Sequence, residues 1–146
     1  NLVNVGNINA AIDWAVDKCF HIVYIKHNNI SPGTRTFKPG TRGEALAPEL
    51  KVVSDNVFVK TKANALTSEA FASFIEANGI TEFYIAGADA TACVKSTCFN
   101  MAKNGYSVHV LSDCVTSYDL KKVPEMLTYY AGKGCEVKTI QEYVIQ

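Results

Sequence analysis

Cys93 is the residue of this sequence best placed for nucleophilic chemistry. It follows an apolar run that ends at Gly87, and it falls in the first turn of a helix predicted over residues 91–104. Backbone N–H groups in such a turn lack helical acceptors and the helix dipole favours negative charge, so both would stabilise a thiolate. The same N–H groups could hold an oxyanion. From position alone, a small buried cysteine without a role is an equally good interpretation.

Two further side chains of catalytic type follow apolar runs. Lys60 ends the run over residues 57–60, and its ammonium could help to keep a nearby thiolate charged. Taken alone, Lys60 is better interpreted as a surface lysine at the end of a strand. His27 could form a thiol-protease-like triad with Cys93 and Asp113. A polar loop residue or a substrate contact is the better interpretation of His27, because spacing alone does not place it against Cys93.

The remaining cysteines indicate neither a metal site nor a disulfide framework. The sequence has five cysteines, and it contains no C-x-x-C pair or other zinc spacing. In a chain of 146 residues with no visible secretion signal, we expect the other four to be packing residues: Cys19, Cys98, Cys114 and Cys135. Asp113 is expected to cap a turn.

Short β-branched and aromatic runs alternate with segments of helical spacing. The runs predict strands over residues 21–26, 57–60, 82–87, 107–112 and 136–140. Helices are predicted over residues 8–20, 68–78, 91–104 and 123–131, and the Asn-Gly pairs at 78–79 and 104–105 are expected to stop two of them. This alternation indicates an α/β fold: a three-layer α/β/α sandwich around a doubly wound, mostly parallel sheet.

The predicted strands bring the reactive positions together. In open α/β sheets, ligands bind at the carboxyl ends of the strands. The residues that leave those ends are therefore expected along one edge: His27, Lys60, residues 88–93 and Asp113. The long irregular stretch over residues 27–53 is rich in Pro, Gly, Thr and Arg, and a loop of this length is more often functional than accidental. The chain opens on a polar segment and goes straight into a helix, so we expect a first strand to be missing.

Composition narrows the classes of function. Apolar residues make up 48% of the chain and the formal net charge is zero, which is typical of a single globular domain over residues 1–146. Without a basic stripe there is no electrostatic case for nucleic acid. No apolar run approaches the length of a membrane span, so the cytoplasm is the expected location.

Three segments resemble the isochorismatase/nicotinamidase-like superfamily of cysteine hydrolases. IAGADATACVKST, over residues 85–97, resembles its nucleophile motif G-x-x-T-x-x-C-V. NGYSVHVLSD, over residues 104–113, resembles the G-Y-x-V-x-V-x-x-D that follows. KTKANAL, over residues 60–66, resembles the lysine motif K-x-x-x-S-A-F, with Asn64 and Leu66 replacing the usual Ser and Phe.

The resemblance implies roles for several residues. The superfamily uses an Asp-Lys-Cys triad, in which Cys93 would attack a carbonyl and Lys60 would stabilise charge. The oxyanion donors would be the backbone N–H groups of Asp89 and Cys93, and a cis peptide would join Ala88 to Asp89. For the substrate pocket the implied residues are His27, Leu66 and Thr91.

The triad aspartate has no counterpart in this sequence. In the superfamily it ends the first strand in a D-x-Q motif, whereas this chain starts after that point and Asp13 and Asp17 fall within the predicted first helix. The domain is therefore expected to be N-terminally incomplete. The D-x-H metal motif of nicotinamidases is also lacking, so we expect no metal and no other cofactor.

Several functional hypotheses follow. The first is a metal-independent cysteine hydrolase acting on a small amide or related molecule, with amide and vinyl-ether hydrolysis both open. The second is a non-catalytic isochorismatase-like binding or assembly protein that has lost the triad acid. A nucleotide-binding Rossmann-like module comes third, because no G-x-G-x-x-G follows any predicted strand. The resemblance also implies a homo-oligomer with a small-molecule substrate, and neither nucleic acid nor a membrane as partner.

Overall fold

A computed structural model describes residues 5–27, 50–117 and 119–145 of the chain. Most of the long stretch predicted to be a functional loop, residues 28–49, lies outside the described residues. Within the described part, no helix has the length and apolar character needed to cross a membrane.

The strands form two parallel sheets. In the first, β1 (Tyr24–His27) pairs with β2 (Val57–Lys60), and the register sets His27 directly beside Lys60. In the second, the order is β3 (Glu82–Ala88), β4 (Ser107–Thr116) and β5 (Glu136–Lys138). No ladder of hydrogen bonds joins the two sheets within the described residues.

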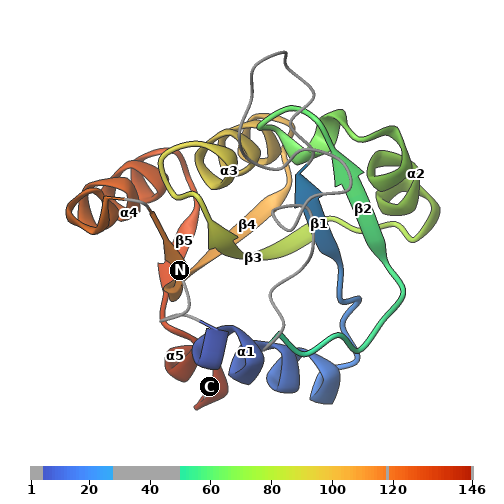
Figure 1. Cartoon of the computed structure of the whole chain (residues 1–146), viewed down its shortest axis with the longest axis horizontal. Helices are drawn as coiled ribbons and strands as arrows, with labels where there is room; N and C mark the ends of the chain where they lie inside the picture. The colour runs from blue at the N-terminus through green and yellow to red at the C-terminus, as the bar shows by residue number, and fades with distance from the viewer. Residues whose placement is uncertain (1–4, 28–49, 118, 146) are drawn as a thin grey trace.

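Helices cover both sides of the strands (Figure 1). One side carries α2 (Glu69–Ala77), α3 (Cys93–Lys103) and α4 (Val123–Gly132), and the other carries α1 (Val5–Asp17) and α5 (Ile140–Val144). Two short 3₁₀ helices complete the described elements, η3 (Ala65–Thr67) before α2 and η4 (Leu120–Lys122) before α4. The predicted α/β class with three layers and parallel strands is confirmed.

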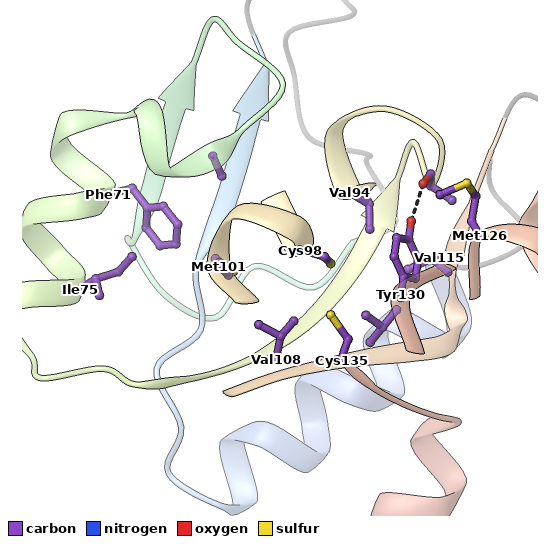
Figure 2. Packing of buried hydrophobic residues seen from close by; sticks show 13 residues of the cluster. Phe71, Ile75, Val94, Cys98, Met101, Val108, Val115, Met126, Tyr130 and Cys135 are labelled. Carbon is purple, nitrogen blue, oxygen red and sulfur yellow. Dashed lines mark hydrogen bonds between the residues drawn. The ribbon is translucent and has the colours of Figure 1, made fainter. Parts of the chain in front are cut away.

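The main core lies between the strands and the layer of α2, α3 and α4 (Figure 2). Phe71 of α2 contacts Phe58 of β2 and Phe83 of β3, with ring centroids 5.6 and 6.4 Å apart respectively. This helix therefore packs against both sheets, which share one apolar cluster although no ladder joins their described strands. Burial of each such aromatic ring contributes roughly 1.5–3 kcal/mol, so side-chain packing holds the sheets together.

A second, smaller cluster lies under α1 and α5. Trp14 of α1 contacts Tyr84 of β3 and Tyr143 of α5, with ring centroids 5.2 and 5.7 Å apart. The buried members of this cluster are Ala11, Leu111, Cys114, Ile140 and Tyr143.

Local sequence signals place most element boundaries correctly. Ser68 accepts a hydrogen bond from the backbone N–H of Phe71 and so caps α2. Asn78 and Asn104 end α2 and α3, and the glycines that follow each have a positive φ. Both predicted Asn-Gly stops are confirmed.

The first helix and the C-terminal segment differ from the predictions. The helix spans Val5–Asp17 rather than residues 8–20, and the chain leaves it with Cys19 at a φ of 60°. Cys19 is exposed, so the prediction that it is a packing residue is wrong. The predicted strand over 136–140 ends at Lys138, because Thr139 and Glu142 form a capping box that starts α5.

The prediction that Asp113 leaves a strand at its carboxyl end is also wrong. β4 continues to Thr116, and its pairing with β3 jumps from Ile85↔Val110 to Gly87↔Val115. Such an irregularity re-aims the side chains of the longer strand. Asp113 thus turns away from the predicted edge, and its carboxylate accepts a hydrogen bond of 3.0 Å from the N–H of Ile140 at the start of α5.

Candidate active site

A tight turn connects β3 to α3 and contains the Ala88–Asp89 peptide bond, which is cis. The carbonyl oxygen of Asp89 accepts hydrogen bonds from the N–H groups of Ala92 and Val94, at 3.1 and 3.0 Å. Its carboxylate accepts two more, from the N–H and the hydroxyl of Thr91, at 2.9 and 3.0 Å. The turn is therefore closed by its own residues, and Asp89 accepts all four of these bonds.

Two neighbouring elements fix this turn from outside. The N–H of Ala90 donates to the carbonyl of Thr116, at 2.8 Å, where β4 ends. The hydroxyl of the fully buried Tyr130, on α4, donates to the carbonyl of Ala90 (Figure 2). Because Ala90 is itself completely buried, both of its backbone groups have the protein partners that burial requires.

Cys93 is the first residue of α3 and is half-buried, with a free thiol. The preceding residue, Ala92, has no side chain that could cap the helix. The N–H groups of the first helical turn therefore depend on other acceptors. Helix N-termini of this kind favour a thiolate and can bind the oxygen of an anionic intermediate.

Lys60 is buried, with 6% of its surface exposed. Its ammonium contacts the Nδ1 of His27 at 3.0 Å and donates to the carbonyl of Lys62 at 3.1 Å. Burial and the neighbouring ammonium both hold the pKa of His27 below its ordinary value, so neutral His27 is the acceptor in this contact. No carboxylate of the described residues lies within ion-pair distance of Lys60.

The structure does not join Lys60 to Cys93 by a hydrogen bond within its described residues. Lys60 ends β2 in the first sheet, and Cys93 follows β3 of the second. Their connection runs through Thr97, one turn along α3, whose buried hydroxyl bonds to the backbone at Ala63 and Ala65. The side chain of His27 contacts Lys60, and the carboxylate of Asp113 bonds to the start of α5. The structure therefore does not form a thiol-protease-like triad of His27, Cys93 and Asp113.

The remaining residues implied for the pocket have contacts within the protein. Leu66 is half-buried and packs against the main core cluster. The hydroxyl of Thr91 donates to Asp89. Asn64, the other departure from the lysine motif, accepts a hydrogen bond from the N–H of Leu66 and thereby caps η3.

Three cysteines are buried as predicted: Cys98, Cys114 and Cys135. Hydrogen bonding with Cys135, together with burial, raises the pKa of Cys98. Burial and the nearby Asp113 carboxylate raise the pKa of Cys114 to about 12. Within the described ranges, no group of three or more His, Cys, Asp or Glu side chains could hold a metal ion.

Sequence reasoning missed Tyr130, Thr116 and Thr97. Of these three, only Thr97 could have been found from the sequence. It lies four residues after Cys93 and thus on the same side of one helix. Tyr130 and Thr116 are far from Cys93 along the chain, and their contacts with Ala90 come only from the packing of α4 and β4.

A family model described as the isochorismatase domain matches residues 3–142. The chain belongs to the isochorismatase family. Among curated proteins, the domain is 27% identical over 90 residues to isochorismatase domain-containing protein 1 of Salmo salar, covering 62% of this chain and 32% of that protein. The matched region thus spans about a third of that relative.

Solved structures share the fold of this isochorismatase domain. An isochorismatase-like hydrolase from Alkaliphilus metalliredigens has a TM-score of 0.87 at 21% identity, covering 98% of this chain and 82% of that one. N-carbamoylsarcosine amidase from Thermoplasma acidophilum has a TM-score of 0.80 at 22% identity, covering 94% of this chain and 83% of that one.

Proposed function

We propose that this isochorismatase domain is a metal-independent cysteine hydrolase that acts on a small amide or related molecule. Cys93 is the nucleophile, and Lys60 is the cation that stabilises negative charge beside it. The domain carries no D-x-H motif, so no metal ion is assigned to the reaction. Its similarity to a protein named an amidase supports an amide as the bond cleaved.

The observation that carries this proposal is the burial of Lys60 without a carboxylate partner among the described residues. A buried ammonium is costly unless it is paired with an anion, and both of its acceptors here, His27 and the carbonyl of Lys62, are neutral. A charge retained in such a position favours an anionic partner that is present during function. A thiolate, a carboxylate or an oxyanion in the reaction would each supply that partner.

The chemistry follows from the helix start at Cys93. Its thiolate forms a bond to the carbonyl carbon of the substrate, and the oxygen becomes an oxyanion held by the backbone N–H groups of Asp89 and Cys93. The C–N bond then breaks, and the amine leaves with a proton. Water attacks the resulting thioester, which releases the acid and regenerates the thiol of Cys93.

The proton transfers need an acid–base group, and we propose that it arrives on a strand between the two sheets. A parallel strand placed between β1 and β3 would join both sheets into one, and its carboxyl end would lie between Lys60 and Cys93. An aspartate there would fill the missing triad position and pair with the ammonium of Lys60.

The test is release of ammonia from a panel of small aliphatic and aromatic primary amides by the protein that carries this additional strand. We expect hydrolysis of at least one amide, and we expect Cys93→Ala to abolish it. Cys98→Ala is the matched control, since that thiol is buried on the same helix and has no part in the reaction. Ammonia release that persists in Cys93→Ala would contradict the proposal.

A second candidate is a non-catalytic binding or assembly protein. It is favoured by the lack of a carboxylate near Lys60 within the described residues. In that case no amide of the panel is hydrolysed, even when iodoacetamide alkylates Cys93 readily. Binding of small carboxylates that depends on Lys60 would then support an anion-binding role for the same site.

A further inference from the structure

Thr97 is buried, with 7% of its surface exposed, and its hydroxyl forms two hydrogen bonds across the core. Its hydroxyl accepts from the N–H of Ala65 at 2.9 Å and donates to the carbonyl of Ala63 at 3.3 Å. Both partners lie in the segment between Lys60 and α2. One side chain on α3 thus uses both its donor and its acceptor to hold this segment.

The held segment is also the one that holds the ammonium of Lys60. The carbonyl of Lys62, which accepts from the Lys60 ammonium at 3.1 Å, lies one residue before Ala63. Ala65 is buried as well, so the backbone around it has little freedom to move. The position of the Lys60 ammonium therefore depends on a backbone that is fixed to α3.

Thr97 and Cys93 belong to the same helix and are one turn apart. Because the helix backbone is rigid over one turn, the hydroxyl of Thr97 is at a fixed offset from the thiol of Cys93. We infer that Thr97 is a positioning residue, which sets the location of the Lys60 ammonium relative to the Cys93 thiol. This inference rests on the proposed function, since it assigns Thr97 a role through Lys60.

The test measures the rate of Cys93 alkylation by iodoacetamide as a function of pH. All variants carry Cys19→Ser, because Cys19 is exposed and would compete for the reagent. Thr97→Val keeps the shape of the side chain but loses both hydrogen bonds, and Thr97→Ser keeps the hydroxyl. Ser96→Ala is the control. Ser96 precedes Thr97 on α3, and its hydroxyl makes no hydrogen bond to the described residues.

We expect Lys60→Met to slow alkylation near neutral pH about tenfold, as a shift of one pH unit in the midpoint would do. Thr97→Val should slow it several-fold, whereas Thr97→Ser and Ser96→Ala should match the parent. In a Lys60→Met background, Thr97→Val should have no further effect. Circular dichroism checks the fold, and Thr97→Ala replaces Thr97→Val if that variant does not fold.

Three outcomes would overturn the inference. If Lys60→Met slows alkylation and Thr97→Val does not, Thr97 is structural and the proposed role of Lys60 stands. If Thr97→Val slows alkylation equally with and without Lys60, its effect does not pass through the lysine. If Lys60→Met alkylates like the parent, the role of Lys60 in the proposed function fails first, and that of Thr97 fails with it.

Discussion

The thiols of the five cysteines lie in different surroundings. Cys98 is fully buried in the same core cluster as Cys135, and Cys114 is fully buried beside the carboxylate of Asp113. Each of these surroundings makes a thiolate harder to form. Cys93 instead begins a helix and is half-buried, so a reagent in solution can reach its thiol.

Limited alkylation should therefore modify Cys93 before the buried thiols. In a Cys19→Ser protein treated with substoichiometric iodoacetamide, we expect peptide mapping to find Cys93 labelled at least tenfold faster than Cys98 or Cys114, because a thiol with a pKa near 12 is almost wholly protonated at neutral pH. Equal labelling rates in the folded protein would remove Cys93 as the candidate nucleophile.

His27 gives a second prediction at the scale of single residues. Its pKa lies below the ordinary value of 6.5 in the folded chain, first because of burial and then because of the Lys60 ammonium. The unfolded chain thus binds a proton at a pH where the folded chain does not, so stability is present above pH 6.5 and falls as the pH is lowered through it.

Urea midpoints measured at about pH 7.5 and about pH 5.5 test this dependence. We expect His27→Asn to lose less stability on acidification than the parent, because asparagine does not titrate in this range. His21→Asn, at an exposed histidine, is the control and should behave like the parent. The same acid sensitivity in His27→Asn and in the parent would contradict the assignment.

Among the elements, α4 and β4 determine the shape of the turn before Cys93. Ala90 receives a hydrogen bond from Tyr130 and gives one to Thr116, so the turn is fixed at its middle residue. Burial raises the pKa of Tyr130, which keeps its hydroxyl protonated and able to donate. The geometry of the candidate oxyanion site thus depends on a helix that contributes no residue to the proposed chemistry.

Tyr130→Phe should destabilise the domain and slow the alkylation of Cys93. The substitution leaves the buried carbonyl of Ala90 without its donor, which costs about 1–3 kcal/mol. Chemical denaturation measures the loss of stability. Tyr129→Phe is the matched control on the same helix, since its hydroxyl makes no hydrogen bond to the described residues, and it should change stability by less than about 0.5 kcal/mol. Equal stability of Tyr130→Phe and Tyr129→Phe would contradict the role of this bond.

At the scale of the whole molecule, two sheets share one core, and no ladder of hydrogen bonds joins them in the part of the chain that the structure describes. Their contact passes through side chains such as Phe71, which touches β2 and β3 together. Exposed apolar side chains also remain, including those of Val57 and Val59. These two residues are two positions apart on β2 and therefore point to the same face of the first sheet. Apolar surface of this kind favours association with another polypeptide.

The chain is accordingly expected to be a homo-oligomer. Light scattering at micromolar concentration should give a mass above that of a single 15.9 kDa chain. The mass should fall on dilution if the association is reversible. A mass equal to one chain across the whole dilution series would contradict this expectation.

Local signals let the sequence determine the elements and the place of Cys93. Alternating apolar runs and helical spacing need only neighbouring residues, and the Asn-Gly stops and the Ser68 cap act within one turn. The motif around Cys93 is continuous as well, so it could be recognised without a structure. The end of β4 could not, because the irregularity in its pairing depends on β3.

Only the tertiary structure decided which side chains meet. The contact of Lys60 with His27 joins residues 33 positions apart, and the bond of Tyr130 to Ala90 joins residues 40 apart. The two bonds of Thr97 span 32 and 34 positions. Periodicity carries no information on such pairs, since they arise when separate helices and strands pack around one core. The sequence alone therefore determined which residues could react, and packing decided which of them stand together.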